Sequence, residues 1–239
     1  MAGKNSIIIK SIKMQRVNIF NQIHKGLRTA LYDTALFLQR TDFTNEGEIE
    51  EAVERTREVL MLFDEHARKE DKYVFPAIQP FEPSVVNSFE QDHEKDLSLS
   101  ASLDHSLDAF HYLSDNQEKL EAGRNINREF VAFMGFNLDH MAREEAMINQ
   151  ILWRYFDDAY ILDIQRTIVR NTEPWHNDFF SKWMLRGNND KDIHGWLKSV
   201  QETAPPIVFN TLFHKAEQEL PKPRFQKLMT SLSEGAMLA

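Results

Sequence analysis

Two short segments of this 239-residue chain carry the same pattern of side chains that could bind a metal ion. In each, a histidine is followed four residues later by a glutamate, and a second acid comes directly after that glutamate. The two pairs are His66 with Glu70 and His140 with Glu144. Because residues four apart share one face of an α-helix, each pair can present an imidazole and a carboxylate to the same point.

Both pairs lie on the apolar face of their predicted helices, where ionisable side chains are unusual. The apolar residues spaced three and four apart are Leu60, Phe63 and Ala67 around His66, and Ile126, Phe130, Phe133 and Ile151 around His140. An unpaired carboxylate is costly to bury, so a bound cation is the simplest explanation for these positions. His-x-x-x-acid spacing also arises by chance, and it is the apolar phase, occurring twice, that makes this pattern specific.

The composition limits the chemistry that such a site can use. Cysteine is absent, which excludes thiolate nucleophiles, disulfides, iron–sulfur clusters and zinc–thiolate sites. A metal here must be held by imidazole and carboxylate, a set that suits non-haem iron, manganese or zinc. The net charge of -9 and the lack of a long basic run argue against nucleic acid as a partner. No apolar run is long enough for a membrane span, so we expect a cytoplasmic protein.

Four long amphipathic helices are predicted before the composition changes near Tyr155. They are expected at about residues 15–40, 48–79, 83–114 and 118–155, with turns near 43, 80 and 117. Long helices with short connections are typical of an all-α, up-down-up-down four-helix bundle. The first helix carries His24 and the third carries His93 on their apolar faces.

The spacing of these residues from the turns predicts that they meet. Antiparallel neighbours in a bundle face each other at equal distances from their connecting turn, and a helix rises about 1.5 Å per residue. Counting residues from each turn places the four histidines at one level of the bundle: His24, His66, His93 and His140. The two glutamates are displaced from their histidines in the same direction. Two carboxylates would then face each other between four imidazoles, an arrangement that can bridge two metal ions.

This ordered set of ligands resembles the hemerythrin-like, HHE cation-binding family over about residues 14–155. The family motif is a histidine on helix one, His-x-x-x-Glu on helix two, a histidine on helix three and His-x-x-x-Glu on helix four. The matching residues are His24, His66 with Glu70, His93, and His140 with Glu144. The run from Glu70 to Pro76 is also similar to the family's acidic pair followed by a Phe-Pro helix end. The resemblance implies two iron ions bridged by an oxo or hydroxo group, and manganese or zinc would fit the same ligands.

One position departs from the oxygen-carrying members of the family. They have a fifth histidine one turn after the helix-three ligand, and this chain has Leu97 there. We therefore expect open coordination positions on both metals, and we expect Leu97→His to bring a fifth imidazole to the metal. The ligand set is closer to that of proteins implicated in repairing iron centres and handling nitric oxide. Their additional cysteine-bearing domain has no counterpart in this cysteine-free sequence.

We expect three regions along the chain: a polar and basic lead-in at 1–13, the bundle at 14–155 and a helical extension at 156–239. Prolines and aromatic residues punctuate the extension, whose helices are expected at about 158–170, 174–186, 190–201, 207–219 and 222–233. It contains no chemical motif. The remaining histidines are expected on the surface or outside the ligand set: His105, His111, His176, His194 and His214. Tyr73 is expected to pack on the core face near Glu70.

These observations indicate a di-iron protein that binds, senses or scavenges O2, nitric oxide or peroxide, or that handles iron. A di-iron oxidoreductase of the peroxidase or nitric oxide reductase type is an open alternative, so the sequence does not decide whether the chain is an enzyme. A structural bundle with an empty or zinc-filled site is another. Glu90 and His93 form the Glu-x-x-His pair of ferritin-like proteins, but the first helix offers Gln22 and His24 where that fold needs carboxylates. The expected partner is a small diatomic ligand or peroxide, and a homo-oligomer is compatible with the sequence.

Overall fold

The computed structural model describes residues 16–237, and side chains as far as residue 233. This part of the chain forms helices and no strand, which confirms the all-α prediction. The lead-in expected at 1–13 lies outside the described residues. No described helix combines the length and the apolar character needed to cross a membrane.

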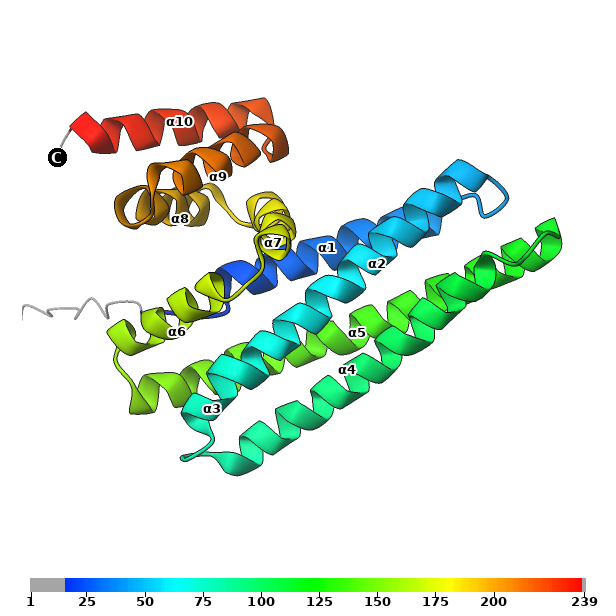
Figure 1. The fold of residues 1–239 in the computed structure, drawn as a ribbon, viewed down its shortest axis with the longest axis horizontal. Helices are drawn as coiled ribbons and strands as arrows, with labels where there is room; N and C mark the ends of the chain where they lie inside the picture. Colours follow the sequence, from blue (N-terminus) through cyan, green and yellow to red (C-terminus); the bar gives the residue numbers. More distant parts are fainter. Residues whose placement is uncertain (1–15, 238–239) are drawn as a thin grey trace, which may run out of the picture.

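Four long helices form the larger part of the molecule. They are α1 (Asn21–Arg40), α2 (Glu46–Lys69), α4 (Pro83–Phe110) and α5 (Asn116–Tyr155). The helices lie side by side, and each runs in the opposite direction to the one before it (Figure 1). Short turns join them, so that residues equally far from a turn face each other across the bundle.

Local sequence signals set where these helices begin. Asn45 caps α2, its side chain accepting hydrogen bonds from the backbone N–H groups of Gly47 and Glu48. Asp115 caps α5 in the same way. The first helix begins at Asn21, later than expected, because the side chain of Asn18 accepts a hydrogen bond from the N–H of Phe20 at 3.0 Å and holds a turn there.

The second long helix contains a π-helical segment that the sequence analysis did not predict. After α2 the chain forms η1 (Glu70–Val74) and then the short α3 (Phe75–Ile78). The N–H of Phe75 bonds to the carbonyl of Glu70, five residues earlier, as in a π-helix. Pro76 has no N–H to offer to an α-helical partner, and its ring crowds the preceding turn, so a widened turn is favoured before it. The widened turn begins at a predicted metal ligand.

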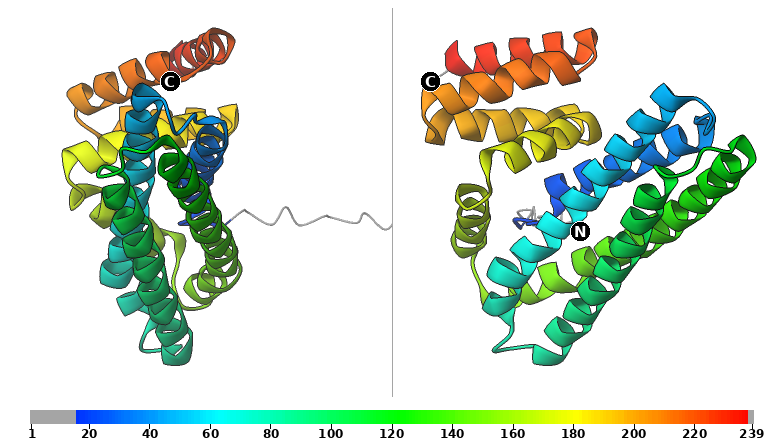
Figure 2. Two further views of the ribbon diagram at one scale, coloured as in Figure 1. Left: turned by 90° about the vertical axis from the view of Figure 1, so that its right-hand side faces the viewer. Right: turned by 45° about the vertical axis from the view of Figure 1, so that its right-hand side comes forward.

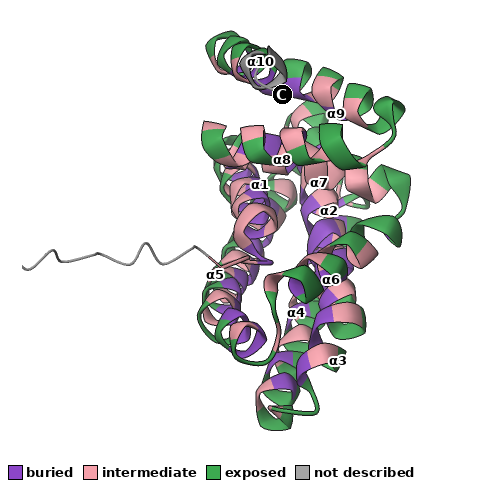
Figure 3. Cartoon of the chain, turned by 90° about the vertical axis from the view of Figure 1, so that its left-hand side faces the viewer, coloured by how far each residue is buried: buried purple, intermediate pink, exposed green. Residues whose placement is uncertain are grey.

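Apolar side chains pack on both sides of the level predicted for the ligands. One cluster lies towards the α1–α2 turn and includes Leu27, Phe63 and Phe133. The other lies towards the α3–α4 turn and includes Phe20 and Phe89. The buried residues line the inner faces of the helices (Figure 3). The ionisable ligand set is therefore enclosed between two apolar layers.

Between residue 156 and the end of the described residues, five further helices follow the bundle, close to the ranges expected from the sequence. They are α6 (Asp158–Arg170), α7 (Pro174–Gly187), α8 (Asp190–Thr203), α9 (Pro206–Glu219) and α10 (Lys222–Met237). Helix α7 lies against α1, whereas α8, α9 and α10 form a layer farther from the bundle (Figure 2). That layer has an apolar core of its own, which includes Leu197, Leu212 and Phe225.

Candidate metal centre

The structure brings all six predicted ligands together inside the bundle. They come from different helices: His24 from α1, His66 and Glu70 from the α2–η1 helix, His93 from α4, and His140 and Glu144 from α5. No side chain of this set is more than 10% exposed. Residues up to 120 positions apart in sequence thus meet because the turns place them at one level.

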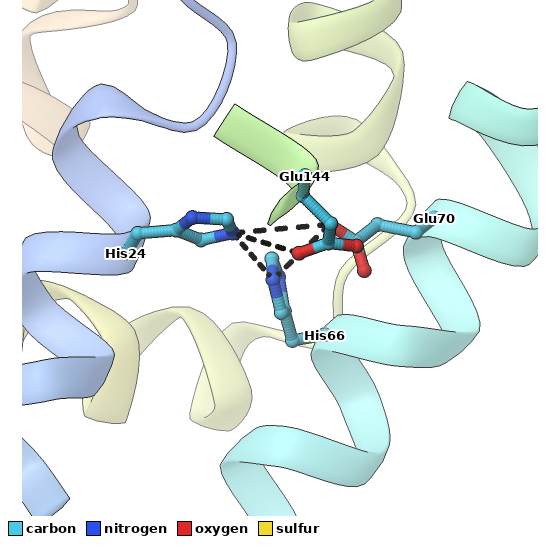
Figure 4. Close-up of side chains that lie close together, drawn as sticks. All are labelled: His24, His66, Glu70 and Glu144. Atoms are coloured by element: carbon cyan, nitrogen blue, oxygen red, sulfur yellow. Dashed lines mark hydrogen bonds and ion pairs between the residues drawn. The ribbon is translucent and has the colours of Figure 1, made fainter. Parts of the chain in front are cut away.

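His24 and His66 form one half of the arrangement, together with one oxygen from each glutamate (Figure 4). Their Nε2 atoms lie 3.0 Å apart and point to the same place. Glu70 Oε1 lies 3.2 Å from His66 Nε2, and Glu144 Oε2 lies 3.5 Å from His24 Nε2. Two nitrogens and two oxygens therefore surround one potential metal position.

His93 and His140 form the other half with the remaining oxygens of the same glutamates. Glu70 Oε2 lies 3.4 Å from His93 Nε2, and Glu144 Oε1 lies 3.2 Å from His140 Nε2. Each glutamate thus directs one oxygen to each half. This is the geometry expected of two carboxylates that bridge a pair of metal ions.

The buried carboxylates fit a bound cation for a second reason. All four oxygens of Glu70 and Glu144 are buried and, within the part of the chain that the structure describes, none makes a hydrogen bond. The same holds for Nε2 of His93. Buried polar atoms are nearly always satisfied, and an ion is the usual partner when no donor is present. This donor set matches the oxygen and nitrogen ligands that iron, manganese and zinc accept.

Three of the four imidazoles are held from behind by a carboxylate. Glu145 Oε1 lies 3.0 Å from Nδ1 of His24, and Asp71 Oδ1 lies 2.7 Å from Nδ1 of His93. These two acids are the ones that directly follow the glutamates in the repeated pattern. Asp92 lies 3.5 Å from Nδ1 of His140. An acid in this position fixes the ring orientation and the tautomer, leaving Nε2 free for a metal.

Charged and aromatic side chains complete the surroundings. Arg28 pairs with Glu145 at 2.9 Å, and Arg143 pairs with Asp92 at 2.8 Å, so two of the orienting acids are themselves held. Phenylalanine rings stack on three of the imidazoles: Phe20 on His24, Phe75 on His93 and Phe136 on His140. These rings limit the access of water and the rotation of the ligands.

The electrostatics of the site differ between its histidines. Burial lowers the pKa of His66 to about 3, so this ring is neutral and has a lone pair for a metal. Burial also acts against protonation of His24, but the hydrogen bond with Glu145 and the nearby carboxylate of Glu70 outweigh it and raise the pKa to about 9. His93 behaves similarly, because Asp71 and Glu70 raise its pKa to about 10 against the effect of burial.

The two glutamates also differ from each other. Burial opposes ionisation of Glu70, yet the imidazoles of His66, His24 and His93 hold the pKa of its carboxyl well below the usual range. Burial and the charge of Glu70 raise the pKa of Glu144. Without a cation, the two carboxylates compete for the same imidazoles, and Glu70 is the better placed of the two.

The expectation for Leu97 is wrong. Leu97 is 60% exposed, and the residue of that turn that faces the interior is Asp96, which is 6% exposed. Asn137 donates a hydrogen bond to Asp96 at 2.5 Å, and burial raises the pKa of this carboxyl. The inward face of α4 passes from His93 through Asp96 to Ser100. The polar pair between α4 and α5 was missed because it depends on the register of two helices that are far apart in sequence.

The other histidines lie outside the ligand set, as expected. His105, His111 and His214 are exposed, and His176 and His194 are half-buried. His176 lies 3.5 Å from Glu65, the residue before His66. Tyr73 packs with the apolar cluster near α3, in agreement with the packing interpretation.

Comparison with known families agrees with this geometry. The sequence model described as hemerythrin HHE cation binding domain matches residues 16–152, more than half of the chain. No curated protein matches it. The matched range begins before α1 and ends within the last turn of α5, so that it contains all six clustered histidines and glutamates. The chain therefore belongs to the hemerythrin HHE cation-binding family.

Proposed function

We propose that this protein holds two iron ions between four histidines and two bridging glutamates, and that it binds, senses or scavenges O2, nitric oxide or peroxide. One observation carries the proposal: each buried glutamate directs one oxygen to the His24–His66 half and the other to the His93–His140 half. A single ion would not need both oxygens of both carboxylates in these directions.

The ligand count supports the binding of a small molecule at the same place. Each half offers two imidazole nitrogens and two carboxylate oxygens. Iron usually takes about six ligands, so two or so positions on each ion would be left to solvent or to an exogenous ligand. When bound, iron supplies redox-active positions for a diatomic molecule or peroxide.

The chain's own residues would control what reaches those positions. The stacked rings of Phe20, Phe75 and Phe136 cover three of the imidazoles and would shield them from bulk water. Asp71 and Glu145 hold the Nδ1 protons of two imidazoles and keep their Nε2 atoms directed inward. The buried Asp96 stands one turn from His93 and is a carboxyl that can keep a proton near the site.

Metal analysis of protein purified without oxygen tests the proposal. We expect about two iron ions per chain and an absorption spectrum that changes on addition of O2 or nitric oxide. Glu70→Gln and Glu144→Gln should each lose metal, since each removes an oxygen from both halves. Protein that takes up zinc but no iron would favour the structural alternative. Sustained turnover of peroxide or nitric oxide with an electron donor would show the enzymatic one.

A further inference from the structure

We propose that α7 acts as a brace that positions the His24–His66 half of the centre, so that the two metal positions are not equivalent. This inference rests on the proposed function, because it takes two metal ions as its starting point. It assigns a role to residues that follow the matched family domain. Helix α7 packs closely on α1, over which it lies in Figure 1, and it also contacts α2.

Two glycines allow α1 and α7 to approach at backbone distance. A β-carbon added at Gly26 would lie 2.9 Å from the backbone nitrogen of Met184. One added at Gly187 would lie 2.5 Å from the carbonyl oxygen of Lys25. Neither glycine has a positive φ, so the contact, rather than backbone conformation, requires the absence of a side chain. The contact lies within two residues of His24.

Polar ties hold α1 on both sides of the same histidine. Lys25 pairs with Asp192 of α8 at 2.6 Å, and Gln22 donates to the backbone carbonyl of Asp192 at 3.2 Å. Asn188, directly after α7, donates to the carbonyl of Gln22 at 3.0 Å. The α1 segment that carries His24 is therefore fixed in position along its axis by the extension, and not only by the bundle.

Contacts of α7 with α2 reach the other histidine of the same half. His176 lies 3.5 Å from Glu65, which precedes His66, and Lys69 pairs with Glu65 at 2.8 Å. About two turns earlier on α2, Trp183 donates a hydrogen bond to Glu58 at 2.6 Å. Thus α7 contacts the chain next to both imidazoles of one metal position.

In the part of the chain that the structure describes, α7 and α8 give the second half no equivalent polar support; of the extension, α6 packs there, in the apolar cluster of Phe75 and Phe89. His93 and His140 lie on α4 and α5. Among the described residues, the side-chain hydrogen bonds and ion pairs that α7 and α8 make to the four long helices end on α1 or α2. Loosening α7 should therefore displace His24 and His66 first, and leave the His93–His140 position largely as it is.

Glycine substitutions test this directly, with matched controls on the same chain. Gly26→Ala and Gly187→Ala would push α1 and α7 apart, whereas Gly195→Ala in α8 meets no atom within 4 Å. Gly123→Ala on α5 would overlap the ring of Phe43 and destabilise the bundle at a place remote from α7. The quantity to measure is the number of iron ions each folded chain retains after dialysis against a chelator.

We expect Gly26→Ala and Gly187→Ala to keep about one ion while wild type and Gly195→Ala keep about two. Gly123→Ala should melt at a lower temperature and still keep both ions. The inference would be overturned if Gly26→Ala and Gly187→Ala lost both ions equally or lost none. It would also be overturned if Gly123→Ala lost one ion in the same way. If Gly26→Ala and Gly187→Ala fail to fold, Asp192→Asn offers a milder test, because it removes the charge from the pair with Lys25. It should speed the release of one ion only. Release of both ions at unchanged rates would count against the brace.

A readout that needs no metal separates this inference from the proposed function. In protein stripped of metal, amide hydrogen exchange in the first half of α1 should quicken in Gly187→Ala and not in Gly195→Ala. Wild-type protein that binds no iron would refute the proposed function. Wild type with two ions and an unchanged exchange pattern in Gly187→Ala would refute the brace alone.

Discussion

At the scale of single residues, the two central glutamates, Glu70 and Glu144, are chemically alike but electrostatically different. Glu70 faces three imidazoles, and their effect holds its pKa well below the usual range against the effect of burial. Glu144 is fully buried, and both burial and the charge of Glu70 raise its pKa. A bound cation would offset the charge of both. In the metal-free protein, Glu70 is therefore stabilising as a carboxylate and Glu144 is not.

Glutamine substitutions should expose this difference. A carboxyl with a lowered pKa contributes stability above its unfolded pKa, so at pH 7 Glu70→Gln should lower the free energy of unfolding of metal-free protein by about 3 kcal/mol. A carboxyl with a raised pKa opposes folding above its unfolded pKa, so Glu144→Gln should raise the free energy of unfolding. Urea denaturation of the two apo variants measures both values. A loss of stability in both would contradict the assigned difference.

The histidines predict how the metal-free protein responds to alkaline pH. The pKa values of His24 and His93 are raised to about 9 and about 10, from 6.5. A raised pKa means that the folded state binds the proton more tightly, so this stability is complete below pH 6.5. It is lost as the pH rises through 9 and 10. The melting temperature of metal-free protein should fall between pH 7 and pH 10, and less steeply in His93→Gln; parallel profiles would disagree with this assignment.

Leu97 and Asp96 show why a part of the site could not be read from the sequence. The residue four positions after His93 is Leu97, and the residue three positions after it is Asp96. Hydrophobicity alone favours the leucine over the aspartate for the interior. In the structure Asp96 faces the interior instead, because Asn137 on α5 donates a hydrogen bond to its carboxylate. That pairing depends on the register of two helices far apart in sequence. The six clustered residues, by contrast, could be predicted because each is polar within an apolar stripe.

Leu97→His should therefore leave the metal centre unchanged. The side chain is 60% exposed, so an imidazole there would point to solvent. Exposed substitutions of this kind usually alter the free energy of unfolding by no more than about 0.5 kcal/mol. Iron content, the optical spectrum and the melting temperature should match those of wild type. A new imidazole signal at the metal would show that α4 lies rotated from its place in the structure.

At the scale of the elements, helix limits were easier to predict than helix shape. Prolines such as Pro174 and Pro206 punctuate the extension, and its helices begin within a residue of the expected positions. The π-helical segment at Glu70–Val74 was not foreseen, although the helix was expected to continue past Pro76 to about residue 79. Here the chain passes Pro76 and continues to Ile78. Packing of Val74 and Phe75 in the core sustains this continuation.

The cap of α2 offers a test of element stability that leaves the site untouched. Asn45 accepts hydrogen bonds from two backbone N–H groups, and Glu48 accepts one from the N–H of Asp42 at 2.8 Å. Asn45→Ala should lower the free energy of unfolding by about 1 kcal/mol, because those donors lose their partner. Chemical denaturation measures the change, and iron content should stay the same. Asn45→Asp, which keeps an acceptor, should retain most of the stability.

At the scale of the whole molecule, the boundary of the matched family domain is not the boundary of the hydrophobic core. The match ends at residue 152. Trp183 of α7 is 4% exposed and belongs to the same apolar cluster as Leu27 and Ala30 of α1. Phe179 and Phe180 pack against that cluster too. By contrast, α8, α9 and α10 bury their residues mainly among themselves. In terms of packing, α7 is part of the bundle.

Two shortened chains should therefore differ strongly in stability. A chain that ends at Tyr155 loses α7 and exposes the α1 surface that Trp183 covers, and loss of a buried tryptophan alone typically costs about 3–5 kcal/mol. A chain that ends at Asn189 keeps α7 and loses mainly the separate outer core. We expect the longer chain to melt cooperatively near the full-length protein, and the shorter one to melt at a much lower temperature or to aggregate. Thermal denaturation followed by circular dichroism, with size-exclusion chromatography, measures both. If the two melt at the same temperature, α7 does not belong to the core of the bundle, and its contact with α1 is too weak to position His24.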